Sequence, residues 1–167
     1  AGPSDCGCLL CLCPAPALAG NVTITDNGTY FTLGNGTVTA KITKSSAQVT
    51  SLVYLGKETV SGNIYFSADG GTSYEQPGNG AFWIKTNTTD RVDVGFRCTM
   101  TNSHWFNVDI HYVLGRNDSG LYVYAELDHP ASYPATSIGE WRMVWKMPQD
   151  QTERIYVDNL RNWQKPS

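Results

Sequence analysis

The strongest period-two pattern of the chain lies between residues 105 and 128. Apolar and polar residues alternate through WFNVDIHYVLG and again through LYVYAELD, and the segment between them, Arg116–Gly120, ends in a glycine that can adopt a positive φ. Alternation over this length is typical of strands that bury one face. The pattern therefore predicts a long antiparallel hairpin with one apolar face and one polar face.

A further alternating segment, SIGEWRMVWKM at residues 137–147, follows the hairpin. We expect it to form a third strand of the same sheet, with Trp141 and Trp145 filling the core. Its polar side would then join the polar face of the hairpin. The side chains gathered on that face would be His111, Tyr122, Tyr124, Glu126, Glu140, Arg142 and Lys146.

The length of the hairpin turn decides which residues face one another. A four-residue loop places His111 opposite Tyr124 in the neighbouring strand. The same register places Asp109 opposite Glu126, and these two carboxylates repel each other unless a cation of the third strand lies between them. A slip of one residue would abolish the cluster.

Shorter segments before and after the hairpin alternate strand and turn signals roughly every ten residues, as in a β-sandwich. The glycine-rich segment 68–80 predicts a long surface loop. Every strand pair is expected to be a local antiparallel hairpin. Because the pattern stops at Ser167 without a closing element, we expect an incomplete sandwich. The remaining predicted strands lie within residues 21–33, 38–42, 49–58, 63–67, 81–86, 91–100 and 153–159.

Composition agrees with one all-β domain, since the 167 residues include 11% aromatic and only 16% charged side chains. The net charge of −3 and the isoelectric point near 5.5 argue against nucleic acid or an anionic membrane as a partner. No run approaches the ~20 apolar residues of a membrane helix. Phosphate-loop, dinucleotide and zinc-protease motifs are absent, so no cofactor is expected. We expect a monomer.

The first nineteen residues differ from the rest of the chain. They hold four of the five cysteines, in a C-x-C-x-x-C-x-C pattern, and end in an A-x-A cleavage pattern before Gly20. We interpret residues 1–19 as the remnant of a secretory leader and 20–167 as the N-terminal part of the β-sandwich domain. The alternative is a zinc site made by the same cysteines. Cys98 is then left as a buried thiol, or as the partner of a cysteine outside this sequence.

Five N-x-S/T triplets are candidate glycosylation sites. Together with the leader, they favour a secreted, extracellular protein. The asparagines concerned are Asn21, Asn27, Asn35, Asn87 and Asn117.

Each polar candidate has two possible roles. Arg142 fits a planar fork for a substrate carboxylate, and it fits equally a structural ion pair with Glu140 or Glu126. His111 has the pKa range of a general acid or base, but a hydrogen-bonded strand histidine is the more common role for such a residue. His104 and His129 are expected in turns.

The blocks that hold these residues resemble a known family. YVLGRNDSGLYVYAELDHPASYPATSIGEWRMVWKMP and ERIYVDNLRNWQKPS are similar to the N-terminal catalytic domain of rhamnogalacturonan lyases of polysaccharide lyase family 4. NGTVTAKITKSSAQVTSLVYLGKE resembles the opening strands of that family, and the resemblance extends over residues 21–167. It implies a galactose-mutarotase-like supersandwich, an antiparallel β-sandwich.

The resemblance also implies a reaction, β-elimination on the pectic backbone of rhamnose and galacturonic acid. This chemistry needs a base for the C5 proton, a proton donor for the departing O4 and a cation on the galacturonate carboxylate. Arg142, in the GEWR block, matches the family's arginine, which implies a role in substrate binding. The family's catalytic lysine and histidine are expected beyond the DNLRNWQKP segment, so the catalytic residues are unknown.

We therefore predict that the chain is a fragment of a rhamnogalacturonan endolyase, inactive on its own if the catalytic residues lie outside it, and that it binds acidic plant cell-wall polysaccharide without a metal ion. One alternative is a non-catalytic carbohydrate-binding sandwich that uses Tyr122, Tyr124 and Arg142. Another is a mutarotase-like isomerase in which His111 and a glutamate, Glu126 or Glu140, exchange protons with a sugar ring. The predicted substrate-binding residues are Arg142, Glu140, Tyr124 and His111.

Overall fold

The computed structural model describes residues 20–69, 74–102, 104–151, 154–156 and 159–164. Every regular element in these ranges is a β-strand and every strand pair is antiparallel, which confirms the predicted all-β class. The same ranges contain no helix long and apolar enough to cross a bilayer. The predicted leader and the alternative zinc site fall on residues 1–19, outside the described residues.

The strands have the following bounds: β1 (Thr23–Asp26), β2 (Tyr30–Gly34), β3 (Val38–Thr43), β4 (Val49–Tyr54), β5 (Lys57–Glu58), β6 (Ile64–Asp69), β7 (Tyr74–Glu75), β8 (Ala81–Asn87), β9 (Arg91–Met100), β10 (Phe106–Gly115), β11 (Tyr122–Asp128), β12 (Glu140–Trp145), β13 (Arg154–Tyr156) and β14 (Asn162–Gln164). Most of them fall within the predicted segments, and β9 has the predicted ends, but β7 lies in the segment 68–80 that was predicted as a loop, and β14 was not predicted.

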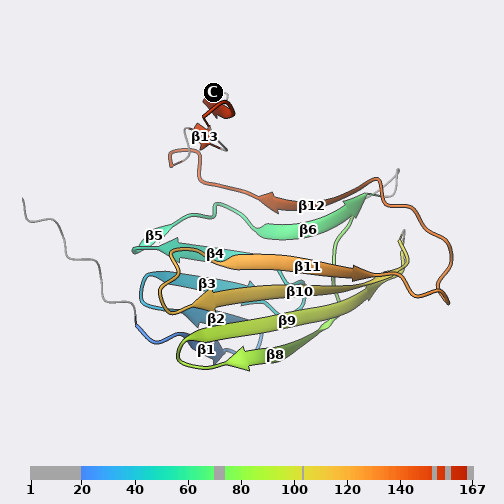
Figure 1. The fold of residues 1–167 in the computed structure, drawn as a ribbon, viewed down its shortest axis with the longest axis horizontal. Helices are drawn as coiled ribbons and strands as arrows, with labels where there is room; N and C mark the ends of the chain where they lie inside the picture. Colours follow the sequence, from blue (N-terminus) through green and yellow to red (C-terminus); the bar gives the residue numbers. More distant parts are fainter. Residues whose placement is uncertain (1–19, 70–73, 103, 152–153, 157–158, 165–167) are drawn as a thin grey trace, which may run out of the picture.

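Two sheets face each other in the sandwich (Figure 1). The larger sheet has the order β1-β2-β3-β4-β6-β12, with β5 beside β4 and β7 beside β6. The smaller sheet has the order β11-β10-β9-β8, and β13 pairs with β14 separately. In Figure 1 the smaller sheet lies in front of the larger one, and β6 and β12 extend beyond its edge strand β11.

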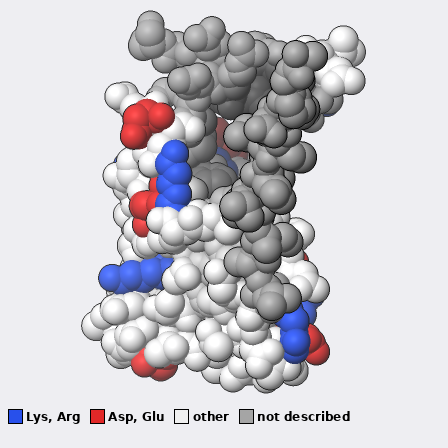
Figure 2. Space-filling view, turned by 90° about the vertical axis from the view of Figure 1, so that its left-hand side faces the viewer, with Lys and Arg blue, Asp and Glu red and all other residues white. Residues whose placement is uncertain are grey.

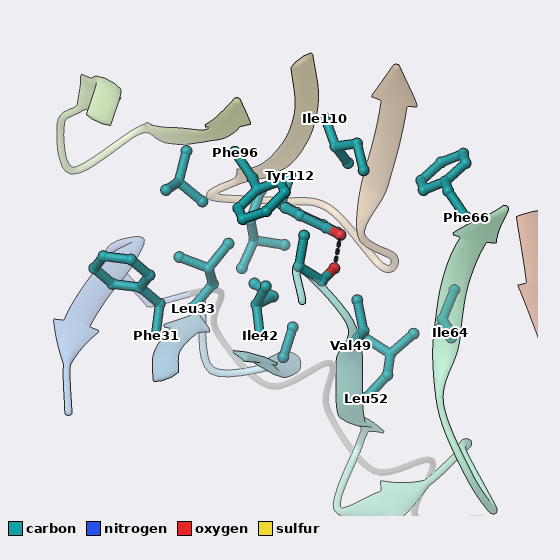
Figure 3. Close-up of a cluster of buried hydrophobic side chains, with 14 of the residues drawn as sticks. Phe31, Leu33, Ile42, Val49, Leu52, Ile64, Phe66, Phe96, Ile110 and Tyr112 are labelled. Atoms are coloured by element: carbon teal, nitrogen blue, oxygen red, sulfur yellow. Dashed lines mark hydrogen bonds between the residues drawn. The ribbon is translucent and has the colours of Figure 1, made fainter. Parts of the chain in front are cut away.

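The core lies between the two sheets and is made by alternate residues of each strand. Strand β10 shows the rule most clearly, since its apolar set is at most 1% exposed, as the period-two pattern predicts. Phe96 of the neighbouring strand β9 packs in the same layer as this set, and Leu33 and Ile42 of the larger sheet face it across the core (Figure 3). The inward residues of β10 are Phe106, Val108, Ile110, Tyr112 and Leu114.

Tyr112 joins the two sheets through the middle of the core. Its hydroxyl donates a hydrogen bond to the carbonyl oxygen of Ala47, in the turn between β3 and β4 (Figure 3). Burial raises the pKa of Tyr112, so the phenol stays neutral and remains a donor. A buried tyrosine of this kind needs a partner for its hydroxyl, and the carbonyl oxygen of Ala47 is that partner.

Asn35 fastens the β2–β3 turn to the loop between β10 and β11. Its side-chain nitrogen donates to the carbonyl oxygens of Gly115 and Asp118, both at 2.9 Å. Its side-chain oxygen accepts from the backbone N–H groups of Thr37 and Val38. Asn35 is fully buried and cannot bond to water, so protein groups provide the hydrogen-bond partners of its side chain.

This geometry corrects one predicted glycosylation site. Both hydrogens of the Asn35 side-chain nitrogen are used inside the protein, so a glycan on that nitrogen is incompatible with this fold. The other four candidate asparagines, Asn21, Asn27, Asn87 and Asn117, are exposed and stay predictions.

The prediction for the third strand of the hairpin sheet is wrong. β12 pairs with β6 in the larger sheet, in the register Arg142 opposite Ser67, and does not pair with β11. The β6–β12 pair, like β4 beside β6, also departs from the expected run of local hairpins. Glu140, Arg142 and Lys146 therefore lie in a different sheet region from His111 and Tyr124.

The sandwich is open between β11 and β12. Trp141 packs on the core, stacked on Phe66 with ring centroids 5.5 Å apart, as predicted. Trp145 does not fill the core, since it is 42% exposed. Together with Met143 and Leu121 it lines an apolar cavity of about 340 Å³ between the two sheets.

We predict that Asn35→Asp destabilises the fold by roughly 2–4 kcal/mol, because a carboxylate would face two buried carbonyl oxygens without a proton to donate. Urea denaturation measures the change. Asn117→Asp, an equivalent change at an exposed triplet, should stay within about 0.5 kcal/mol of the parent protein. Equal losses of stability in the two variants would contradict the role of the Asn35 hydrogen bonds in joining the β2–β3 turn to the β10–β11 loop.

Candidate functional site

The predicted polar residues lie on the outer faces of two different sheets. Trp141 points into the core, so its neighbours Glu140 and Arg142 point outward from the larger sheet. His111 and Tyr124 point outward from the smaller sheet. The two outer faces look in opposite directions, so one sugar residue cannot touch both.

Charge is spread thinly over the end of the sandwich that Figure 2 presents. Lys and Arg side chains on this face are separated from one another, and most lie beside an Asp or Glu. The view shows no stripe of one sign.

On the larger sheet, three neighbouring residues contact the guanidinium of Arg142. Its Nε donates to the Oγ of Ser67 at 2.8 Å, and Ser67 is fully buried. Its Nη1 lies 3.1 Å from an oxygen of Glu140. Its guanidinium carbon lies 3.7 Å from the ring centroid of Tyr74. These contacts fix the plane of the guanidinium while a third of the side chain, 34%, remains exposed.

Both roles predicted for Arg142 can be compared with this geometry. The structural pair with Glu140 is present, whereas the pair with Glu126 is not, since Glu126 belongs to the other sheet. Among the described residues, Nη2 of Arg142 has no hydrogen-bond partner. The guanidinium therefore keeps one donor group for a ligand even while Glu140 is bound.

The smaller sheet carries rows of side chains across its outer face, which we call the histidine face. The predicted register is confirmed: His111 lies opposite Tyr124, and Asp109 lies opposite Glu126. The row of His111 continues through Gly95 to Trp83 on β8. The rows on this face, read from β8 or β9 to β11, are Trp83–Gly95–His111–Tyr124, Arg97–Asp109–Glu126 and Thr99–Asn107–Asp128.

The cation beside the two facing carboxylates is Arg97, not Arg142 or Lys146. Arg97 lies directly opposite Asp109 in β10 and binds its Oδ2 through both Nε, at 3.0 Å, and Nη2. Asp109 is 8% exposed, so these two charge-assisted bonds to one oxygen offset the cost of burying its charge.

His111 is enclosed on the histidine face. Its Nδ1 lies 2.7 Å from Asp93, and its ring stacks on Tyr124 with centroids 4.5 Å apart and planes 3° apart. Trp83 meets the ring edge-on, and only 1% of His111 is exposed. These contacts fit the hydrogen-bonded strand histidine of the two predicted roles.

The isomerase alternative loses its proton pair. The carboxylates in ion-pair range of His111 are those of Asp93 and Asp109. Glu140 lies in the other sheet, and Glu126 makes no hydrogen bond or ion pair with the histidine within the described ranges.

Trp83 lies flat across β9 because Gly95 has no side chain. A Cβ at Gly95 would lie 2.5 Å from Nε1 of the indole, so any larger residue would displace the ring. The indole N–H donates to Asp109 at 3.3 Å, and the guanidinium of Arg97 lies 5.5 Å from the ring centroid. Trp83 thus links the aromatic row to the charged row.

A hollow of about 800 Å³ opens beside these rows. Its charged lining is Arg97, Asp109, Glu126 and Asp128, to which Asn79, Thr99 and Asn107 add neutral polar groups.

The remaining histidines and Cys98 give no catalytic centre. His104, expected in a turn, is instead fully buried, with Nδ1 at 3.1 Å from Glu75. His129 is exposed and bonded to the carbonyl oxygen of Pro134. Cys98 is a buried free thiol, as predicted, and burial raises its pKa, so it is a poor nucleophile. No cluster of three or more potential metal ligands occurs in the described part of the chain.

Comparison with known proteins gives the identity. A family model described as the rhamnogalacturonate lyase family matches residues 15–167. The chain belongs to the rhamnogalacturonate lyase family. No curated protein matches the sequence.

Membership confirms the resemblance drawn from the GEWR and SGLYVYA blocks, both of which lie inside the matched range. It makes this a rhamnogalacturonan lyase domain and implies a polysaccharide substrate. The all-β sandwich agrees with the fold expected for that family.

Sequence reasoning missed Trp83, Arg97 and Ser67 in this lyase-family domain. Arg97 and Trp83 alternate with core residues on β9 and β8, so the period-two pattern could have placed both on the outer face. Ser67 carries no such signal, since its role depends on the pairing of β6 with β12.

We predict that Arg97→Leu costs roughly 1–2 kcal/mol at neutral pH, since Asp109 would face Glu126 without a compensating cation. Glu126→Gln should recover part of this loss in the Arg97→Leu background and have little effect alone. Chemical denaturation of the four proteins gives the coupling energy. If Glu126→Gln has the same effect in both backgrounds, the carboxylates do not interact through Arg97.

Proposed function

We propose that this domain takes part in β-elimination on the rhamnogalacturonan backbone, and that Arg142 binds the galacturonate carboxylate. In this reaction a base removes the C5 proton, the C4–O4 bond breaks, and a C4–C5 double bond forms. The departing oxygen takes a proton. Charge moves onto the carboxylate as the C5 proton leaves, so a fixed cation there lowers the barrier.

The geometry of Arg142 is the observation that supports this role. Its guanidinium is held in one plane by Ser67, Glu140 and Tyr74, which lowers the entropy lost when a ligand is bound. It is partly exposed on an outer face that a long polymer can cross. A planar donor with a free Nη2 suits a carboxylate.

Glu140 and Tyr74 shape this site in different ways. Glu140 neutralises part of the charge of Arg142, so a substrate carboxylate would compete with it for Nη1. Tyr74 is 56% exposed beside the guanidinium and can take one face of a sugar ring. Lys146 lies in the same outward set and adds positive potential.

Proton transfer is not assigned to a residue of the described chain. His104 and His111 are both at most 1% exposed and lie away from the outer face of the larger sheet. The predicted binding residues therefore divide between two faces: Arg142 and Glu140 at the proposed galacturonate site, and Tyr124 and His111 on the opposite side.

We also propose that the protein is secreted, acts as a monomer on acidic plant cell-wall polysaccharide, and carries glycans at one or more of the four exposed triplets. The cleavage pattern before Gly20 and the number of triplets support this. Mass spectrometry of the secreted protein after glycan removal would reveal which asparagines are occupied.

The lyase proposal predicts that rhamnogalacturonan treated with the full-length protein gains ultraviolet absorbance, because elimination creates an unsaturated uronate. Absorbance is followed against polysaccharide alone and against heat-denatured protein. Binding of the polysaccharide without any rise in absorbance would favour the carbohydrate-binding alternative.

We predict that Arg142→Lys weakens binding of a galacturonate-containing oligosaccharide by roughly tenfold or more, since an ammonium cannot reproduce the planar fork. Isothermal titration calorimetry measures the affinity. Arg91→Lys, an equivalent change at an exposed arginine paired with Asp93, is the matched control and should leave binding unchanged. Unaltered binding by Arg142→Lys would leave Arg142 with only its structural pair to Glu140.

A further inference from the structure

We infer that the hollow on the histidine face is a second saccharide site, selective for a neutral sugar. It is separate from the proposed galacturonate site, because the two lie on opposite outer faces of the sandwich. The inference does not depend on the role of Arg142.

The first support is the size and lining of the hollow. At about 800 Å³ it can hold one or two sugar rings, within the usual range of ligand pockets. Its lining mixes carboxylates with the amide of Asn107 and the hydroxyl of Thr99. Sugar hydroxyls both donate and accept hydrogen bonds, so they suit a lining that offers both kinds of group.

The second support is the rigidity of the wall beside the hollow. Asp109 is held by two bonds from Arg97 and a third from the Trp83 indole. Trp83 is fixed in turn by its close approach to Gly95 and its edge contact with His111. Such a fixed wall favours binding, because little freedom is lost when a ligand is held.

The charge of the hollow decides the class of sugar. Arg97 is already paired with Asp109, so Glu126 and Asp128 leave the open part of the hollow negative. Glu126 makes no hydrogen bond or salt bridge among the described residues, and the nearby Lys85 on β8 attracts it only through a longer-range charge interaction. Its carboxylate can accept strong hydrogen bonds from neutral hydroxyls, whereas it repels a uronate.

A cation is a weaker candidate for the same hollow. Three carboxylates line it, but the described residues contain no group of three potential ligands close enough to hold a metal ion. Asp109 shares a row with Glu126 but is already bound by Arg97, and Asp128 lies in the next row, where Asn107 donates to it at 3.3 Å.

Two matched ligands test the inference. Methyl galactopyranoside and methyl galactopyranosiduronate differ only in a hydroxymethyl or a carboxylate at C6. Titration into isotopically labelled protein, followed by amide chemical shifts, should move resonances of β10 and β11 with the neutral glycoside. The uronate should bind there at least about tenfold more weakly, a difference of ~1.4 kcal/mol.

The paired variant Glu126→Gln with Asp128→Asn separates recognition from structural damage. We expect it to weaken neutral binding and to improve binding of the uronate relative to the neutral glycoside, because the repulsion is removed. A merely structural effect would weaken both ligands equally. Asp90→Asn, at an exposed carboxylate paired with Arg116, is the control and should change neither affinity.

The inference is overturned if the neutral glycoside moves no β10 or β11 resonance, or if the uronate binds there as tightly. It is also overturned if the paired variant keeps the original preference. The galacturonate site is read independently, from β6 and β12 resonances and from the Arg142→Lys titration.

Discussion

Strand β10 carries the constraint on which both halves of the structure depend, because successive side chains of a strand point to opposite faces. Its inward set fills the core, while Asp109 and His111 project into the charged network of the outer face. A shift by one residue would bury these polar groups in the core and expose the apolar ones. Two partners prevent such a shift: Tyr112 is bonded to Ala47 in the opposite sheet, and Arg97 grips Asp109 from the neighbouring strand.

Local periodicity predicted the strands and the β10–β11 register because both depend on residues that are close in sequence. It could not predict the neighbour of β12. The alternation of Trp141 with Arg142 shows which side chains share a face, but it is the same whether the strand adds to one sheet or the other. The pairing with β6 depends on contacts across more than seventy residues, such as Arg142 with Ser67. The prediction therefore identified correctly which residues of each strand point outward, but it wrongly placed the residues of β12 on the same sheet as those of β10 and β11.

The same limit applies to individual side chains. Arg142 and Glu140 were predicted as a possible pair because they are two residues apart on one strand, and the pair is present. The burial of His104 depends on Glu75, which lies in the segment predicted as a loop. Asn35 was predicted as a glycosylation site from its triplet alone, and only its contact with the distant β10–β11 loop shows that it is buried. Membership of the lyase family adds a substrate class that neither periodicity nor packing contains.

The two outer faces give the domain contrasting chemistry on opposite sides of one core. A fixed guanidinium faces solvent on the larger sheet, and a negative hollow beside the row of Trp83, His111 and Tyr124 faces solvent on the smaller one. A polymer with both acidic and neutral sugars offers partners for each. Because the faces are separated by the sandwich, they would engage different stretches or branches of such a polymer.

The buried amide of Asn35 has a practical consequence for production of the protein. A host that attaches sugar to N-x-T triplets during chain synthesis would act before this amide is enclosed, and every molecule so modified would be unable to close the β2–β3 corner. The yield of folded protein in such a host would then depend on whether the chain encloses Asn35 before the glycosylating enzyme modifies it. Replacing Thr37 removes the triplet and keeps the amide, because Thr37 contributes only its backbone N–H to Asn35.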